Sequence, residues 1–245
     1  MIGKFIVFEG VEGGGKTTQI QLLRNWLLEK WWSGKLLSKS PDLEVVITRE
    51  PGGTKVGKAL RELLLNADVS GEQIQEKTEL LLYAADRAQH IDTLIKPSLE
   101  RGAIVLCDRF IDSTIAYQGY GRGLDFTLIQ QLNHIATGGL KSDLTFWLDI
   151  DVEIGLTRAK NRGKIDRMEQ ADIQFHQLVK TGYQELAKNN PLIVRIDANL
   201  TIEKVQQQIQ EMIVQKFQQW ENIAEVRSQN SEVRGYKSDN SFDLS

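Results

Sequence analysis

A glycine-rich octapeptide near the start of the chain constrains the fold more than any other feature. Residues Gly10–Thr17, GVEGGGKT, match the pattern G-x-x-x-x-G-K-[ST] without a mismatch. The backbone N–H groups of such a turn point inward around phosphate oxygens, and glycine permits this because side chains would obstruct the approach. An apolar run, Lys4–Phe8, precedes the turn and a helical pattern follows it. We therefore expect this segment to be a P-loop that binds a nucleoside triphosphate.

The residues of this loop have different expected tasks. Lys16 is expected to reach the β- and γ-phosphates, and the Thr17 hydroxyl is expected to ligate Mg²⁺. A chance glycine turn between a strand and a helix is the alternative, but the residue identities and their context agree on a P-loop. The expected ATP-binding set is the loop with the next threonine: Gly10, Val11, Glu12, Gly13, Gly14, Gly15, Lys16, Thr17 and Thr18.

A carboxylate at the end of a second buried strand is the usual companion of a P-loop. Asp108 follows the apolar run Ala103–Cys107, and it is expected to contribute to the Mg²⁺ site or to orient a phosphate acceptor. Asp149 follows Phe146-Trp147-Leu148 and is the competing candidate. Either residue could instead cap a turn at the strand end, so the pattern alone leaves both open.

Strand and helix patterns alternate along the chain, which predicts an α/β fold with a parallel sheet and helices on both faces. Five apolar runs predict strands, at Lys4–Phe8, Glu44–Thr48, Ala103–Cys107, Leu144–Ile150 and Leu192–Ile196. Helical patterns lie between and after them, at Thr17–Trp31, Val56–Leu65, Gln73–Ile95 with a disturbance at Pro97, Asp125–Ala136, Val152–Lys160, Ile165–Ala187 and Thr201–Val226. Residues 1–226 are therefore expected to form one domain, and the polar residues 227–245 are expected to be a disordered tail.

Composition narrows the classes of partner. The formal net charge is −3, which does not support binding to a nucleic acid polymer. No stretch approaches the roughly 18 apolar residues that a membrane span needs. The single cysteine, Cys107, lies on a predicted core strand and excludes an intramolecular disulfide framework, so we expect a cytoplasmic protein.

Arginines distinguish this chain from other classes of P-loop protein. The guanine-binding motif N-K-x-D and the transporter signature L-S-G-G-Q do not occur in the sequence. Arginines do occur at turns and at lid-like positions, where they could stabilise the charge that spreads over a transferring phosphoryl group. These residues are Arg49, Arg87, Arg109, Arg158, Arg162 and Arg167. A phosphoryl-transfer enzyme is therefore favoured.

The sequence resembles the thymidylate kinase family from about residue 3 to residue 215. The matching segments, in the family's order and spacing, are FEGVEGGGKTTQ, TREPGGT, ELLLYAADRAQH, CDRFIDSTIAYQGYGRG and RAKNRGKIDRMEQ. The resemblance implies a P-loop kinase with a five-stranded parallel sheet in a three-layer α/β/α arrangement and a mobile lid at about residues 157–170. It also implies transfer of the γ-phosphate of Mg·ATP to dTMP, giving dTDP and ADP in dTTP synthesis.

The resemblance assigns roles on the dTMP side. Arg49 and Arg109 match arginines that bind the dTMP phosphate, and Glu12 matches the acid that meets the sugar 3′-hydroxyl. Arg87 matches the arginine that recognises the thymine edge, and Tyr117 matches the tyrosine that crowds the 2′ position. The remaining expected contacts to the base are Tyr83, Ser113, Thr114 and Gln118. Tyr83 departs from the family's usual phenylalanine, but either ring can stack.

The resemblance also bears on the lid and on assembly. The P-loop has no arginine between Gly10 and Gly15, so the charge for the transition state is expected from the lid, from Arg158 first and Arg162 second. This is the family's bacterial arrangement. The Glu50–Pro51 peptide bond is expected to be cis, and a homodimer is expected, with an apolar face supplied by the segment from Leu80 to Ile95 or its neighbours.

Two rival functions are weighed against dTMP kinase. The nearer is a kinase for another nucleotide or nucleoside, such as dUMP or CMP. The more distant is a nucleotide-binding regulatory protein that forms no diphosphate product. The complete set of arginines argues against the second rival.

Overall fold

The computed structural model describes residues 3–32, 43–66, 73–161, 163, 167–168 and 170–238. In this part of the chain, five strands form one sheet in the order β2-β3-β1-β4-β5, and every neighbouring pair is parallel. The strands are β1 (Lys4–Glu9), β2 (Val45–Arg49), β3 (Ile104–Asp108), β4 (Leu144–Asp149) and β5 (Ile193–Asp197). The predicted five-stranded parallel α/β fold is confirmed, and the observed strand ends differ from the predicted ones by about one residue.

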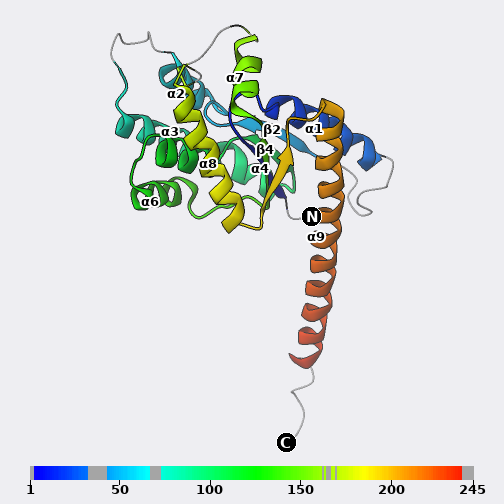
Figure 1. Ribbon diagram of the computed structural model, residues 1–245. Coiled ribbons are helices and arrows are strands. Elements are labelled where there is room, and N and C mark those ends of the chain that lie inside the picture. The colour runs from blue at the N-terminus through cyan, green and yellow to red at the C-terminus, as the bar shows by residue number, and fades with distance from the viewer. Residues whose placement is uncertain are drawn as a thin grey trace, which may run out of the picture.

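Helices cover both faces of the sheet (Figure 1). They are α1 (Lys16–Trp32), α2 (Lys55–Leu65), α3 (Glu76–His90), η1 (Ile91–Ile95), α4 (Lys96–Glu100), α5 (Ile111–Thr114), η2 (Ile115–Gly121), α6 (Phe126–Thr137), α7 (Val152–Asn161), α8 (Ile173–Asn189) and α9 (Ile202–Ser238). Among the described helices, none has the length and apolar character that crossing a membrane requires.

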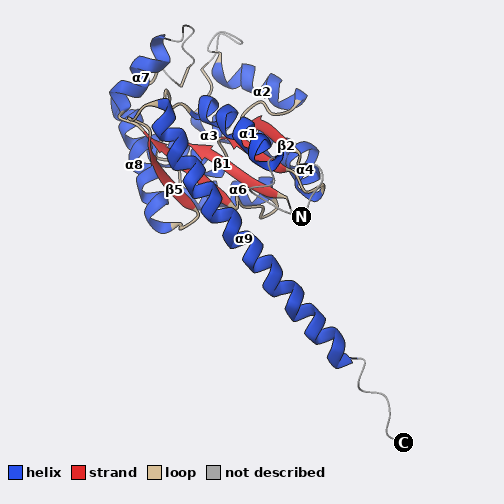
Figure 2. Cartoon of the chain, turned by 90° about the vertical axis from the view of Figure 1, so that its right-hand side faces the viewer, coloured by secondary structure: helices blue, strands red, loops and turns tan. Residues whose placement is uncertain are grey.

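The side chains of β1 alternate between two cores, as the period of a strand requires. Ile6 and Phe8 lie in the larger core, which also contains residues of α1, α8 and α9. Phe5 and Val7 lie in the smaller core with residues of η1 and β3. Figure 2 shows α1 and α9 together on one side of the sheet. Burial on both faces explains why these strands are continuously apolar in sequence.

The helical segment after residue 75 differs from the prediction. Helical structure does not stop before Pro97 but runs from Glu76 to Glu100 through one π-helical turn, η1. A π turn shifts the backbone hydrogen bonds from i→i+4 to i→i+5. Pro97 then lies in the first turn of α4, where a missing N–H is tolerated. A second π turn, η2, contains Tyr117 and Gln118, two of the predicted site residues.

The C-terminal helix is also longer than predicted. α9 continues to Ser238, so residues 227–238 of the expected disordered tail are helical, and residues 239–245 lie outside the described residues. Figures 1 and 2 show α9 projecting away from the sheet. The physical reason is that helix propagation from a packed segment adds one hydrogen bond for each residue fixed. Residues 221–234 contain neither proline nor glycine to interrupt it.

The P-loop lies against the first turns of α7. A Cβ atom built on Gly13 would lie 1.9 Å from the carbonyl oxygen of Gly155, and one built on Gly155 would lie 2.5 Å from the carbonyl oxygen of Glu12. Both distances are shorter than any real Cβ contact. Glycine at both positions therefore allows the phosphate loop and α7, which leads into the lid segment, to touch backbone to backbone.

This contact predicts the effect of Gly155→Ala. An alanine in a helix normally stabilises the protein relative to glycine by about 1 kcal/mol. Here we expect a loss of about 1–3 kcal/mol in the free energy of unfolding, because the new methyl group overpacks the contact, together with weaker ATP binding. Urea unfolding and an ATP titration measure both. Thr157→Ala, an exposed position of α7, is the control; a Gly155→Ala variant as stable as this control would contradict the prediction.

Candidate active site

One cavity of about 620 Å³ lies at the carboxyl ends of the central strands, the edge at which open parallel sheets bind their ligands. It joins the P-loop to the ends of β2 and β3, to α3, to η2 and to the start of α9. Most of the sequence-predicted site residues line it, namely Glu12, Gly13, Gly14, Gly15, Lys16, Thr17, Thr18, Arg49, Tyr83, Arg87, Asp108, Arg109, Ser113, Thr114, Tyr117, Gln118 and Arg158. Gly10 and Val11 are not among its lining residues, although they belong to the same loop.

The P-loop has the backbone conformation that its glycines predict. Gly10, Gly13 and Gly15 have φ angles of 136°, 71° and 85°, a region in which other residues are strained. The Lys16 Nζ atom donates hydrogen bonds to the carbonyl oxygens of Gly10 at 3.0 Å and Val11 at 3.1 Å. Burial lowers the pKa of Lys16 from its ordinary value. The lysine is thus a buried cation held over the loop that carries it.

Thr17 and Asp108 come together at the loop although 91 residues separate them in sequence. The Thr17 hydroxyl donates to the Asp108 carboxylate at 3.2 Å. An oxygen-only pair with few protein ligands suits Mg²⁺, which retains waters and binds substrate phosphates. The competing candidate, Asp149, is instead paired with Arg195 at 2.7 Å and Lys180 at 3.0 Å. Within the described residues, no group of three or more His, Cys, Asp or Glu could bind a metal by itself.

Arg109 connects the P-loop to α5 and η2. Its φ angle of 72° is unusual for a residue with a side chain. The guanidinium donates to Tyr117 Oη at 3.0 Å and to Ser113 Oγ at 3.1 Å, and it forms an ion pair with Glu12. Burial by itself would lower the pKa of Arg109, but the groups around it, Glu12 first and then Tyr117, Tyr183 and Asp108, together outweigh burial and raise the pKa above its ordinary range. Arg109 therefore remains a fixed cation.

Glu9 and Tyr183 lie directly behind this site, where both contact Ser113, and neither is among the residues predicted from the sequence. The buried Glu9 carboxylate accepts hydrogen bonds from Phe110 N at 2.7 Å, Ser113 Oγ at 2.5 Å and Tyr183 Oη at 2.8 Å. Burial raises the pKa of Glu9. Glu9 was detectable, because it ends β1 as Asp108 ends β3. Tyr183 gives no local signal, since α8 brings it to the site from 174 residues away.

The predicted base-recognition residues have partners within the protein. Arg87 is almost fully buried, and its Nε donates to Glu50 at 2.8 Å, its Nη1 to Asn133 at 2.6 Å and its Nη2 to the carbonyl of Phe110 at 3.0 Å. Gln118 donates to the buried carboxylate of Glu79 at 2.8 Å. These contacts fix both side chains where they line the cavity.

The lid segment is described only in part. Arg158 lines the cavity and donates to the carbonyl of Ala198 at 3.3 Å. Arg167 does not line it and is bound to Glu79 and to the carbonyl of Leu64. Arg162 lies outside the described residues. Of the two predicted lid arginines, the structure therefore places Arg158 at the cavity.

The turn that follows β2 is held by Asp86, a residue of α3. The peptide bond between Glu50 and Pro51 is cis, as expected. Gly52 N donates to Asp86 Oδ1 at 3.0 Å, and the second oxygen of this carboxylate is buried without a hydrogen-bond partner among the described residues. Burial, reinforced by the charge of Glu50, raises the pKa of Asp86 to about 6.

Comparison with known proteins gives a consistent result. The profile of the family described as thymidylate kinase matches residues 8–209. The chain is 78% identical over 225 residues to a thymidylate kinase of Trichodesmium erythraeum, covering 91% of this chain and 100% of the relative. It is 52% identical over 229 residues to a thymidylate kinase of Acaryochloris marina, covering 90% and 99%. The crystal structure of a thymidylate kinase from Ehrlichia chaffeensis matches with a TM-score of 0.67 and 36% identity, covering 86% of this chain and 98% of that chain.

The raised pKa of Asp86 predicts a pH dependence of stability. Because the folded-state pKa of about 6 exceeds the ordinary value of 3.8, folding favours the protonated carboxyl, and stability is lost as the pH rises through 6. Asp86→Asn mimics the protonated form. We expect its stability relative to the parent to increase by about 1 kcal/mol between pH 5 and pH 7.

Urea unfolding at the two pH values measures this difference. Asp92→Asn changes an exposed carboxylate in the adjoining η1 turn and serves as the control. A stability difference for Asp86→Asn that does not change with pH would refute the prediction.

Proposed function

Because this chain belongs to the thymidylate kinase family and catalyses the ATP-dependent phosphorylation of dTMP to dTDP in nucleotide biosynthesis, we propose how its own residues divide that work. One observation carries the proposal: a single cavity joins the P-loop to the arginines and tyrosines predicted for the acceptor. Both nucleotides would thus bind in one space, with ATP on the P-loop side and dTMP between β2, α3 and η2.

The dTMP phosphate is proposed to bind between Arg49 and Arg109. Arg49 ends β2 and Arg109 follows the neighbouring strand β3, and the register pairs Arg49 with Asp108, the residue before Arg109. Within the described part of the chain, Arg49 pairs with no carboxylate, so it can meet an incoming anion. Arginine binds phosphate in a bidentate manner. Glu12, the partner of Arg109, is proposed to accept a hydrogen bond from the sugar 3′-hydroxyl.

The nucleoside is proposed to lie against α3 and η2. Tyr83 would stack on thymine, Arg87 would recognise the base edge, and Ser113, Thr114 and Gln118 would complete the polar contacts, since all of them line the cavity. Tyr117 is buried against Phe175 and is held by Arg109. A ring fixed in this way supports its proposed task, the steric exclusion of a ribose 2′-hydroxyl.

The triphosphate is proposed to bind to the P-loop residues from Gly10 to Thr18. Thr17 and Asp108 are the proposed Mg²⁺ ligands, because the structure joins their oxygens at the loop. When bound, Mg²⁺ would neutralise charge on the β- and γ-phosphates. Lys16 would bind the same phosphates once its Nζ leaves the loop carbonyls.

Transfer is proposed to proceed in line, with the protein supplying position and charge. Arg49 and Arg109 hold the acceptor oxygen toward the γ-phosphate, and Lys16 stabilises the charge that develops there. Arg158 and Arg162 are the proposed lid cations, and lid closure would exclude water and so prevent wasteful ATP hydrolysis. A general base is not required, because a phosphate monoester is already ionised.

A homodimer and a cytoplasmic location are also proposed. α3 packs against α2 and α6, and all three helices carry exposed large apolar side chains: Val56, Leu81, Leu128 and Ile135. In the predicted segment from Leu80 to Ile95, both end residues are buried, so Leu81 supplies its exposed apolar surface. The cytoplasm is proposed because ATP and dTMP are metabolites of the cell interior.

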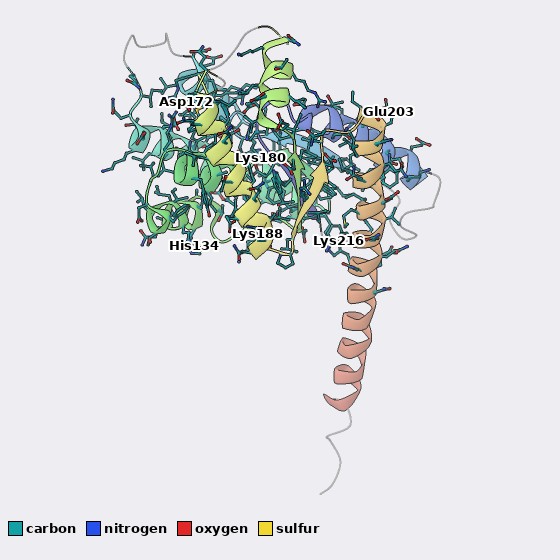
Figure 3. The ribbon with its side chains drawn as sticks, viewed as in Figure 1. His134, Asp172, Lys180, Lys188, Glu203 and Lys216 are labelled. Carbon is teal, nitrogen blue, oxygen red and sulfur yellow. The ribbon has the colours of Figure 1, made fainter. Side chains whose placement is uncertain are left out.

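Lys16→Ala tests the catalytic scheme. We expect the rate of dTDP formation from ATP, Mg²⁺ and dTMP to fall at least about 100-fold, because a single preorganised charge contact to the transition state has that effect. The control is Lys188→Ala, which changes an exposed lysine near the end of α8 (Figure 3). A near-normal rate for Lys16→Ala would refute the scheme, and a panel of dTMP, dUMP and CMP tests the acceptor preference in the same assay.

Ile135→Glu tests the proposed dimer face. Ile135 is 75% exposed on α6, and a charge placed in an apolar interface is costly. We expect sedimentation at micromolar concentration to shift from dimer to monomer. Leu178→Glu, on the exposed side of α8, is the matched control and should leave the dimer unchanged. Identical sedimentation of the two variants would contradict the proposal that α6 lies in the dimer interface.

A further inference from the structure

A buried series of hydrogen-bonded polar side chains lies behind the part of the cavity where the base is proposed to bind. His90, at the end of α3, has no exposed surface and does not line the cavity. Its Nδ1 atom lies 3.0 Å from Glu50 Oε1, and its Nε2 atom lies 2.6 Å from Thr48 Oγ1. Glu50 and Arg87, which continue the series through the 2.8 Å contact between Glu50 Oε2 and Arg87 Nε, both line the cavity.

The hydrogen-bond roles in this series follow from its chemistry. An ionised carboxylate only accepts, so the Nδ1 atom of His90 carries the proton that Glu50 Oε1 receives. In the neutral ring, Nε2 is then the acceptor of the Thr48 hydroxyl. The two oxygens of Glu50 are thus divided, one for the imidazole and one for the guanidinium. His90 fixes the plane of the carboxylate that Arg87 binds.

The imidazole of His90 is packed closely against Gly53. A Cβ atom built on Gly53 would lie 2.4 Å from His90 Nε2 and 2.6 Å from Thr48 Oγ1. The turn after β2 therefore packs directly against the imidazole ring. Glu50 belongs to the same turn, so its backbone and the imidazole that binds its side chain are packed as one unit.

Arg87 is held by three acceptors and retains donors for a ligand. Its Nε, Nη1 and Nη2 atoms each make one bond, to Glu50, Asn133 and Phe110. A guanidinium has five N–H donors, so one donor remains on each Nη atom. The direction of these donors depends on the rotation of the guanidinium plane, which the bond from Nε to Glu50 fixes.

We propose that His90 is a positioning residue for acceptor-base selectivity: through Glu50, it fixes the guanidinium of Arg87 so that its remaining donors face the base. This inference rests on the proposed role of Arg87 at the thymine edge. The 4-position of thymine carries an oxygen acceptor, whereas that of cytosine carries an amino donor. Donors held in a fixed direction bind the oxygen of thymine and are mismatched with the amino group of cytosine. A guanidinium that can rotate discriminates less between the two bases.

Two substitutions of similar size separate positioning from packing. The amide nitrogen of His90→Asn lies near the place of Nδ1 and can donate to Glu50. The amide of His90→Gln lies near the place of Nε2, so it retains the link to Thr48 and loses the link to Glu50. We expect His90→Gln to raise the KM for dTMP about tenfold, in line with the loss of a charge-assisted hydrogen bond. The KM for ATP should stay within about twofold of the parent value.

Selectivity is the second readout. The ratio of kcat/KM for dTMP to that for 5-methyl-dCMP should fall about tenfold in His90→Gln and should lie closer to the parent ratio in His90→Asn. Equal losses in the two variants, or a rise in both KM values that follows the loss of melting temperature, would overturn the inference. Glu50→Gln removes the charge from the carboxylate without changing the histidine and should lose the same selectivity. Parental selectivity in Glu50→Gln would also overturn the inference.

A double-mutant cycle distinguishes the two levels of the proposal. Arg87→Ala by itself should raise the KM for dTMP, and adding His90→Gln should then have no further effect, because the two residues act through one series of hydrogen bonds. If Arg87→Ala leaves dTMP binding and selectivity unchanged, the proposed role of Arg87 fails. If Arg87→Ala has its effect but the effect of His90→Gln simply adds to it, the positioning role of His90 fails and that of Arg87 stands.

Discussion

The parallel pairing of β1 with β3 is the constraint on which the whole site depends. The register sets Phe8 beside Asp108, and the backbone N–H of Arg109 donates to the carbonyl of Phe8 at 2.9 Å. Because parallel strands end at the same edge, the P-loop and the Asp108-Arg109 pair emerge side by side. The pairing of β2 with β3 then adds Arg49 at the same level. The backbone hydrogen bonds between the strands thus bring charged side chains from distant parts of the sequence to the same place.

Carboxylates organise the cations of this site. At the cavity, Glu12 pairs with Arg109 and Glu50 with Arg87. A cavity for two anionic nucleotides needs positive charge, but unpaired buried cations would be costly. Each pairing reduces that cost and fixes the direction of a guanidinium before a ligand arrives. Arg49, outside such a pair in the described chain, lies where the acceptor phosphate is proposed to bind.

Irregular backbone is concentrated around the same cavity. The π turn η1 begins directly after His90, and the π turn η2 contains Tyr117. Arg109 adopts a positive φ angle. Such conformations persist only where the surroundings determine them. The bonds of Arg109 to Ser113, Tyr117 and Glu12 are surroundings of this kind. The regular sheet therefore sets the position of the site, and these irregular segments aim its side chains.

The sequence by itself determined the phosphate loop, the strands and most of the cavity lining, because these features rest on local rules. A glycine pattern specifies a turn, an apolar run specifies a buried strand, and an acid that ends a strand lies at the ligand edge. Only the tertiary structure decided that Asp108, rather than Asp149, meets Thr17, and that Tyr183 and His90 lie behind the site. These outcomes depend on which strands are neighbours and on which face of a helix is buried, and contacts between residues 40 to 174 positions apart leave no local pattern.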